Sequence, residues 1–346
     1  MSAWPGAVND GGMQAWVVDR AASDPAGPIA IERADLPQPS PGPGEVRLKV
    51  LACGVCRTDL HLAQGDLAPR RPRTVPGHEI VGLVDAAGDG AERFTIGARV
   101  GAAWLRSTDG RCRFCRTGHE NLCPAAQFTG WDADGGFAEY ALVPEAFAYR
   151  LPDALSDAVA APLLCAGIVG YRSLQRAGLP PGGRLGIYGF GASAHIVARV
   201  AIAQGATVHV VTRSAAARRF AVELGAASAS GEGEAPPEPL DSAILFAPTG
   251  DLVPAALRAL DRGGVLSLAG IHLSDVPPLN YERDLFYERE IRSVTTNTRA
   301  DGEEFLRVAA AIGLQPVVHE HPLGDAKQVL QDLLDGAYTG AAVLTP

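Results

Sequence analysis

A glycine-rich turn between a buried strand and a helix constrains the fold of this chain most. The apolar segment Arg184–Tyr188 predicts a strand, the run Gly189-Phe-Gly191-Ala-Ser-Ala194 follows directly, and residues 195–204 predict a helix. In such a strand–turn–helix unit the glycines allow a tight turn, and the helix N-terminus binds a pyrophosphate. We interpret Gly189, Gly191 and Ala194 as a dinucleotide-binding turn rather than as a plain tight turn.

The rhythm of the chain changes near residue 158. Before it, apolar alternation at 14–19, 45–51, 75–87 and 99–104 predicts short strands and loops with little helical period. After it, short apolar strands at 209–212, 242–247, 265–269 and 291–294 alternate with helical stretches, which predicts a parallel sheet with crossover helices. The expected helices at 303–312 and 326–335 would return the chain to a β-rich first domain.

The end of the second parallel strand should indicate which dinucleotide binds. An acidic residue there would bind the ribose 2′-hydroxyl of NAD. This chain instead has Thr212 and Arg213, with Arg218 one turn later and no acid before Glu223. The pattern favours the 2′-phosphate of NADP. The alternative is that Arg213 stacks on adenine or faces solvent, and that NAD binds.

Bulk composition excludes several classes of partner. A chain of 346 residues is long enough for two domains. Its net charge of -9 argues against nucleic acid and against anionic membranes. The longest apolar run, at 158–170, is too short to span a bilayer, and the N-terminus carries no secretory signal pattern. We therefore expect a soluble, cytoplasmic protein with no membrane partner.

Residues 56–79 combine a thiol, two imidazoles and carboxylates. Cys56, Asp59, His61, His78 and Glu79 lie within this segment. Thiolate and imidazole ligands suit zinc better than magnesium or calcium. The segment alone does not supply a complete ligand set.

A second cysteine group, Cys112-x2-Cys115-x7-Cys123, has the spacing of a zinc lobe but supplies only three thiolates. Asp109 stands three residues earlier, and a carboxylate can complete a zinc tetrahedron. With four ligands such a site would be structural. The alternative is that packing holds the lobe and that metal binds weakly.

Together these residues resemble the zinc-dependent alcohol dehydrogenases of the medium-chain dehydrogenase/reductase superfamily. The resemblance is carried, in the family's order, by residues 54–61, 76–79, 120–123, 135–140, 165 and 189–194. It implies an α/β protein, with a GroES-like β-rich catalytic domain at 1–157 and 300–346 and a Rossmann doubly wound parallel-sheet domain at 158–299.

The resemblance also implies a ligand set for the catalytic zinc. It assigns Cys56, His78 and Cys165 to the metal, with Glu79 able to enter or leave its coordination sphere. The assignment of Cys165 rests on the resemblance alone, because a lone cysteine in an apolar segment is usually a buried thiol.

Further roles follow from the same resemblance. Thr58 and His61 match a proton relay that runs through a cofactor ribose hydroxyl to solvent. We expect Asp59 to accept the ring N–H of His78 and Arg57 to meet the pyrophosphate. Arg299, where the chain returns to its first domain, could touch cofactor or close the cleft between the domains.

Four positions are candidates for the substrate pocket. Trp104 matches a wall position in the family, and Phe128 and Trp131 follow nearby, although core packing would explain all three equally well. Leu67 stands near positions where small-alcohol enzymes carry bulkier residues, which predicts a roomier pocket.

The leading hypothesis is therefore a zinc-dependent alcohol dehydrogenase or aldehyde reductase that favours NADP. It would act on a primary or secondary alcohol, or its carbonyl product, as a homodimer or homotetramer. One alternative is the same chemistry with NAD. Another is a non-catalytic nucleotide-binding protein on this fold.

Overall fold

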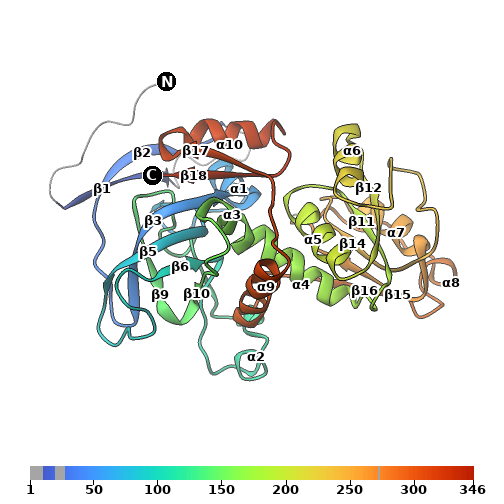
Figure 1. The fold of residues 1–346 in the computed structure, drawn as a ribbon, viewed down its shortest axis with the longest axis horizontal. Helices are drawn as coiled ribbons and strands as arrows, with labels where there is room; N and C mark the ends of the chain where they lie inside the picture. The colour runs from blue at the N-terminus through green and yellow to red at the C-terminus, as the bar shows by residue number, and fades with distance from the viewer. Residues whose placement is uncertain (1–10, 20–27, 272) are drawn as a thin grey trace. The chain divides into compact units, whose positions relative to one another are not determined.

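The computed structural model describes residues 11–19, 28–271 and 273–346 (Figure 1). Residues 1–10, where we expect no secretory signal, lie outside that part. The chain forms two compact units. The first is Met1–Cys165 with Thr298–Leu306 and Gln315–Pro346, and the second is Ala166–Asn297 with Arg307–Leu314. The domain boundaries at 157/158 and 299/300 stay a prediction.

The first unit is built on the long strand β3 (Glu45–Val55). Its side chains alternate, so that Val46, Leu48 and Val50 are buried. It pairs antiparallel with β5 (Glu79–Ala87) in a register that sets Gly54 opposite Glu79. The main sheet has the order β10 (Ala148–Arg150), β6 (Arg99–Ala102), β5, β3, β18 (Ala341–Thr345) and β17 (Val318–Pro322), and β9 (Tyr140–Pro144) also pairs with β3. A smaller sheet has the order β2 (Glu32–Pro37), β1 (Gly12–Asp19) and β4 (Arg73–Thr74).

A short helix, α1 (Arg57–Gln64), follows β3 directly. We did not predict it, because eight residues give too little length to show a helical period. Cys56 is its N-cap: its sulfur accepts the Thr58 N–H, while Asp59 accepts the Cys56 N–H, as in a capping box. Gly65 ends the helix in the left-handed region, with φ of 89°. One thiol thus both begins a helix and lies in the predicted metal segment.

The second unit contains the predicted parallel sheet. Its order is β13 (Ser228–Ser230), β12 (Thr207–Val211), β11 (Arg184–Tyr188), β14 (Leu240–Leu245), β15 (Leu260–Leu268) and β16 (Glu290–Ser293). All neighbouring pairs are parallel. The prediction of a parallel sheet is confirmed. The edge strand β13 was missed because Ser228–Ser230 is short and only partly buried.

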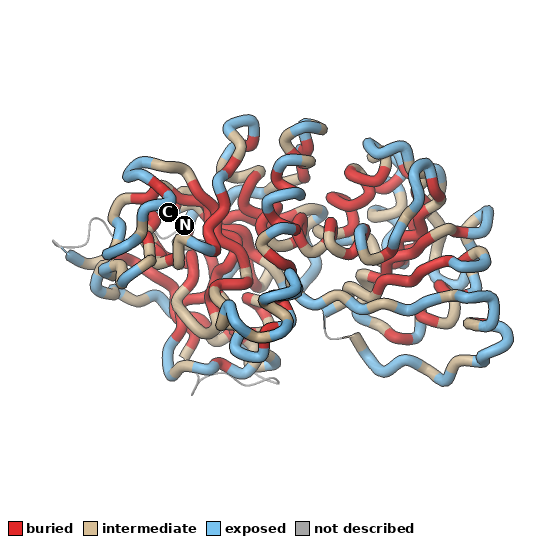
Figure 2. The backbone as a smooth tube through the Cα atoms, turned by 90° about the horizontal axis from the view of Figure 1, so that it is seen from below, coloured by how far each residue is buried: buried red, intermediate tan, exposed pale blue. Residues whose placement is uncertain are grey.

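Helices cover both faces of this sheet. Ser242 and Ala243 are consecutive residues of β14, so their side chains point to opposite faces. The Ser242 hydroxyl donates to the Ala177 carbonyl at the end of α4 (Ile168–Ala177). Ala243 belongs to the apolar cluster that contains Leu257 of α7 (Val253–Ala259). The inner strands β12, β11 and β14 are mostly buried, which explains their largely apolar sequences (Figure 2).

The two helices expected near the C-terminus are present. They are α9 (Arg299–Ala311) and α10 (Ala326–Leu334), and α10 contributes Ala326, Val329 and Leu330 to the core of the first unit. Within the described parts of the chain, no helix combines the length and apolarity needed to cross a bilayer.

A histidine is buried in α5 (Ala192–Ala203), the helix that follows the glycine-rich turn. His195 is 1% exposed, and its Nδ1 lies 3.3 Å from the Gly191 carbonyl. No residue of the described chain hydrogen-bonds its Nε2. Burial lowers the pKa of His195 from 6.5 to about 4. The imidazole is therefore neutral in the folded protein at neutral pH.

This pKa predicts an acid-sensitive contribution to stability. The unfolded chain binds a proton at His195 below pH 6.5 and the folded chain only below about 4. The free energy of unfolding should fall as pH drops between those values, by about 2 kcal/mol at pH 5. In urea titrations at pH 7 and pH 5, His195→Leu should lose less free energy of unfolding between the two pH values than wild type does. His319→Gln, at an exposed histidine, should lose as much as wild type. Equal pH dependence of wild type and His195→Leu would contradict the assignment.

Candidate catalytic metal centre

Four predicted ligands from distant parts of the sequence meet in the first unit. The ligand atoms of Cys56, His78, Glu79 and Cys165 all lie within 4.8 Å of one another. Nε2 of His78 is 3.3 Å from Sγ of Cys56 and 3.3 Å from Sγ of Cys165. Cys56 caps α1, His78 and Glu79 start β5, and Cys165 lies in a π-helical turn (Leu163–Gly167).

The donor set fits zinc. Zinc bonds of ≈ 2.3 Å to sulfur and ≈ 2.0–2.1 Å to nitrogen place neighbouring ligands of a tetrahedron about 3.6 Å apart. Both sulfur–nitrogen distances are slightly shorter than this, so a small outward movement of the side chains would admit the ion. Two thiolates, one imidazole and one carboxylate are also a ligand chemistry that zinc prefers.

Asp59 connects the two ligand-bearing segments. It is 2% exposed, and its carboxylate accepts the backbone N–H groups of Cys56 at 3.0 Å and Gly77 at 2.9 Å. Its Oδ1 also lies 3.4 Å from Nδ1 of His78, longer than an ordinary hydrogen bond. Asp59 thus faces the ring nitrogen that points away from the thiols, so that Nε2 is directed at the ligand cluster.

Burial and charge act together on the pKa values of the cluster. Burial lowers the pKa of His78, but the charges of Cys56 and Asp59 outweigh it and raise that pKa well above its usual value. A hydrogen bond from Cys165 lowers the pKa of Cys56. Burial, followed by the charge of Cys56, raises the pKa of Glu79. The site gathers acidic groups in a buried volume where burial and mutual repulsion disfavour their charged forms, and a divalent cation would compensate those charges.

Two glycines give the cluster room. A Cβ at Gly54 would lie 1.8 Å from Oε2 of Glu79, so only glycine leaves space for that carboxylate. Gly77 has φ of 95°, and a Cβ there would also meet Phe137 and Cys53. The sequence pattern marks both glycines only as members of longer motifs. The places of Gly54 and Gly77 in the sequence, close to Cys56 and His78, were the signal that could have indicated a crowded site.

The predicted relay residues lie on α1. Thr58 and His61 are three residues apart, so they share one face of the helix. The Thr58 N–H donates to Sγ of Cys56 at 3.3 Å. Nδ1 of His61 lies 3.0 Å from Asp66 at the exposed end of the helix. Arg57 is exposed in the first turn.

Three aromatic rings extend from the metal ligand His78. The ring of Trp104 lies edge-on to His78 with centroids 4.9 Å apart. Trp104 stacks with Phe128 at 5.0 Å and with Trp131 at 5.9 Å, with interplanar angles of 19° and 14°. All three rings are half-buried, and Trp131 also packs against the apolar core of the first unit. Leu67 is half-buried in the loop after α1.

The second predicted metal group is also assembled in the first unit. The ligand atoms of Asp109, Cys112, Cys115 and Cys123 lie within 4.8 Å of one another. Oδ1 of Asp109 accepts the N–H groups of Arg111 and Cys112, both at 2.9 Å. These bonds hold the pKa of the Asp109 carboxyl well below its usual value. The carboxylate is therefore ionised and fixed beside the three sulfurs.

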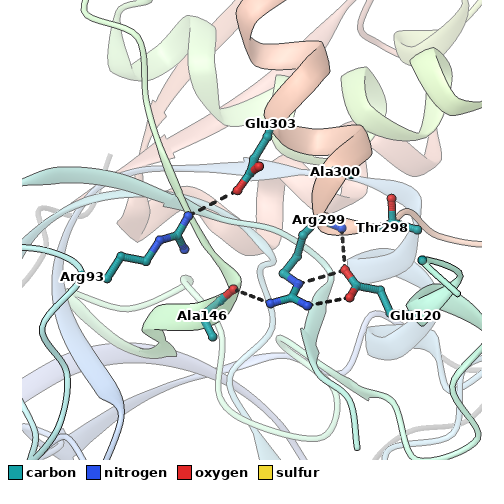
Figure 3. Close-up of a pocket in the computed structure, with 8 residues that line it drawn as sticks. Arg93, Glu120, Ala146, Thr298, Arg299, Ala300 and Glu303 are labelled. Atoms are coloured by element: carbon teal, nitrogen blue, oxygen red, sulfur yellow. Dashed lines mark hydrogen bonds and ion pairs between the residues drawn. The ribbon is translucent and has the colours of Figure 1, made fainter. Parts of the chain in front are cut away.

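Arg299 lines a cavity of ≈ 410 Å³ in the first unit (Figure 3). Its backbone N–H, Nε and Nη2 donate to the Glu120 carboxylate at 2.8, 2.9 and 2.7 Å. Glu120 stands three residues before Cys123, so the ion pair links the cysteine lobe to the start of α9. Arg93 pairs with Glu303 at 3.3 Å in the same cavity. A contact of Arg299 with cofactor stays a prediction.

In the second unit, the glycine-rich turn has the geometry that a phosphate requires. Gly189 has φ of 86°, and a Cβ there would lie 2.7 Å from the backbone of Ala247. Gly191 precedes α5, and among the described residues no atom beyond its chain neighbours lies within 4 Å of the place that a Cβ would take there; Ala194 is fully buried. The turn therefore leaves open space in front of a helix N-terminus.

The residues after β12 differ in their surroundings. Thr212 is 9% exposed. Nη1 of Arg218 donates to the carbonyls of Thr212 and Arg213 at 2.8 and 2.7 Å, so this side chain shapes the turn. The Arg213 side chain is 82% exposed and lies 3.4 Å from Glu232.

Comparison with known proteins identifies the family. Residues 42–153 match the model of the alcohol dehydrogenase GroES-like domain. The chain is 57% identical over 338 residues to a Mycobacterium tuberculosis (strain CDC 1551 / Oshkosh) protein named "Probable alcohol dehydrogenase AdhA", covering 96% of this chain and 97% of that one.

Solved structures agree with this similarity. The acetophenone reductase of Geotrichum candidum NBRC 4597, in complex with NAD, superposes with a TM-score of 0.86 at 27% identity over 99% of both chains. A Sinorhizobium meliloti 1021 protein bound to NADP gives a TM-score of 0.83 at 26% identity over 97% of this chain and 99% of that one. With the metal cluster, the glycine-rich turn and these similarities, the chain belongs to the zinc-type, NAD(P)-dependent alcohol dehydrogenases of the medium-chain dehydrogenase/reductase superfamily.

Proposed function

We propose that this enzyme interconverts primary or secondary alcohols and their aldehydes or ketones, with NADP as the preferred cofactor. The observation that carries the proposal is the convergence of Cys56, His78 and Cys165, with one imidazole nitrogen facing both sulfurs. We place the reaction in the cytoplasm, where six free thiols would stay reduced.

In this proposal Cys56, His78 and Cys165 hold the catalytic zinc, and Glu79 is a fourth ligand that can give way to substrate. A bound zinc ion would act as a Lewis acid that lowers the pKa of an alcohol hydroxyl, while the nicotinamide accepts hydride. Asp109, Cys112, Cys115 and Cys123 would hold a second, structural zinc. Asp59 orients His78 through its carboxylate.

The proton released from the alcohol must leave a buried site. We assign its path to Thr58 and His61. The Thr58 backbone already contacts the Cys56 sulfur, and His61 is one helical turn nearer solvent, with Asp66 beside its ring. A hydroxyl can accept and donate a proton in one step, and an imidazole can exchange it with water.

Removing the Thr58 hydroxyl should therefore slow alcohol oxidation. Thr58→Ala should lower kcat/KM by about 100-fold or more, the usual size of lost acid–base catalysis. Thr58→Ser keeps the hydroxyl and should retain most activity. The zinc content of both variants should equal that of wild type, because Thr58 is not a ligand. Wild-type kinetics in Thr58→Ala would exclude the proposed path.

The preference for NADP rests on Arg213. Its side chain is exposed, has only Glu232 as an ion-pair partner among the described residues, and follows a strand with no acidic residue at its end. A guanidinium in this position can form charge-assisted hydrogen bonds with a 2′-phosphate. Thr212 and the turn shaped by Arg218 would support the same ribose.

Charge reversal tests this preference. Arg213→Asp should lower kcat/KM for NADP by about 10- to 100-fold, the size of a lost hydrogen bond between charged groups, and should spare NAD. Arg219→Asp is a matched control, because Arg219 is also exposed nearby but lies on α6 (Ala215–Glu223). An unchanged ratio of NADP to NAD activity in Arg213→Asp would overturn the assignment.

We also propose that the enzyme is a homo-oligomer, either a dimer or a tetramer, assembled through β16. This strand is at the edge of its sheet. Several large apolar side chains in β16 and in the 20 residues before it are exposed: Ile271, Val276, Tyr281, Phe286, Tyr287 and Ile291. An antiparallel copy centred on Ile291 would set Glu290 opposite Arg292 of the second chain, which is a self-complementary charge pattern.

Light scattering would measure the assembly. Wild type should have a mass of two or four chains, and Ile291→Lys should reduce it because a charge would be buried at the edge. Val222→Lys, at another exposed apolar residue on α6, should leave the mass unchanged. A monomeric wild type at micromolar concentration would refute the proposal.

A further inference from the structure

The outer part of the aromatic cluster is held by one arginine. The Arg70 guanidinium lies 3.6 Å from the centroid of the Trp131 ring. Its Nη1 also donates to Oδ1 of Asp132 at 2.8 Å, and Nε1 of Trp131 donates to the Ala68 carbonyl at 2.9 Å. Arg70 and Ala68 belong to the loop after α1, so three contacts tie this loop to Trp131 and its neighbour.

Asp132, which accepts the hydrogen bond from Arg70, also holds the backbone of Phe128. Its second oxygen, Oδ2, accepts the Phe128 N–H at 2.9 Å. One carboxylate therefore fixes both the arginine that covers Trp131 and the backbone that carries Phe128. Because Trp104 stacks with both rings and meets His78 edge-on, the positions of the outer rings are set relative to the metal ligand.

We infer that Arg70 is a positioning residue that sets the specificity of the enzyme for aryl alcohols and aryl carbonyl compounds. This inference rests on the proposed function. Three half-buried rings, with interplanar angles of 14° to 30°, offer flat apolar faces near the metal ligand, and a flat aromatic substrate gains more from such faces than a linear alkyl chain does. Arg70 holds the Trp131 ring without touching substrate.

A neighbouring arginine provides a matched control. Arg71 donates to Oδ1 of Asp134 at 2.7 Å, and the same oxygen accepts the Val75 N–H. Arg70 and Arg71 therefore each tie this loop to an aspartate of the 131–134 segment. Of the two, Arg70 alone has a ring contact, with Trp131, in the described structure. A loss common to both variants would reflect loop anchoring, and a loss confined to Arg70 would reflect the ring.

The experiment compares kcat/KM for benzyl alcohol and 1-butanol. Arg70→Ala should lower the benzyl-to-butyl ratio about fivefold, which corresponds to ~1 kcal/mol of lost cation–π stabilisation, mainly through a higher KM for benzyl alcohol. Arg71→Ala should keep the ratio within about twofold of wild type. Tryptophan fluorescence should change in Arg70→Ala and not in Arg71→Ala, because of these two arginines only Arg70 lies over an indole in the described structure.

A double-mutant cycle completes the test. Trp131→Leu should lower the ratio by itself, and adding Arg70→Ala to it should have no further effect. Additive effects, an unchanged ratio in Arg70→Ala, or an equal fall in Arg71→Ala would each overturn the inference. If Arg70→Ala does not fold, Trp131→Leu with an unchanged ratio would still overturn it. A wild-type protein that oxidises neither alcohol with either nicotinamide cofactor would instead reject the proposed function.

Discussion

The buried carboxylate of Asp59 is the interaction on which the metal centre depends. A carboxylate that is 2% exposed is costly unless its oxygens are hydrogen-bonded. The Asp59 carboxylate accepts hydrogen bonds from the N–H groups of Cys56, which is a metal ligand, and of Gly77, which precedes the metal ligand His78. The same carboxylate faces His78. One side chain therefore caps α1, joins two segments about 20 residues apart and directs an imidazole at two sulfurs.

The surrounding backbone is adapted to this crowded arrangement. The β3–β5 register sets Gly54 opposite Glu79, and the missing Cβ leaves the space that the Glu79 carboxylate occupies. The left-handed conformation of Gly77 turns the chain so that its N–H reaches Asp59 while the next residue enters the cluster. From the same cluster, the aromatic rings continue outward to Arg70. The chemistry of the centre and its specificity thus share one packed neighbourhood.

Sequence reasoning succeeded where local chemistry decides structure. The strand, glycine turn and helix at 184–204 were predicted correctly because residues next to one another in the sequence specify them. The parallel sheet was predicted from the same local patterns. Sequence reasoning was weaker where distant segments meet. Nothing in the spacing connected Cys165 with Cys56, because their contact depends on the folding of more than a hundred residues between them. The helix α1 was missed because its eight residues are too few to show a helical period and because cysteine is an unusual N-cap. Arg70 lacked any local signal, since its partners lie some 60 residues later.

The most direct test of the catalytic centre is the location of zinc in crystals of the protein, from anomalous scattering on both sides of the zinc absorption edge. We predict two peaks in each chain. One should lie within zinc-bonding distance, about 2.0–2.3 Å, of Cys56 Sγ, His78 Nε2 and Cys165 Sγ. The other should lie between Asp109 and the three cysteines of its lobe. If crystals of the fully zinc-loaded protein showed no peak between Cys56, His78 and Cys165, the assignment of the catalytic centre would be contradicted.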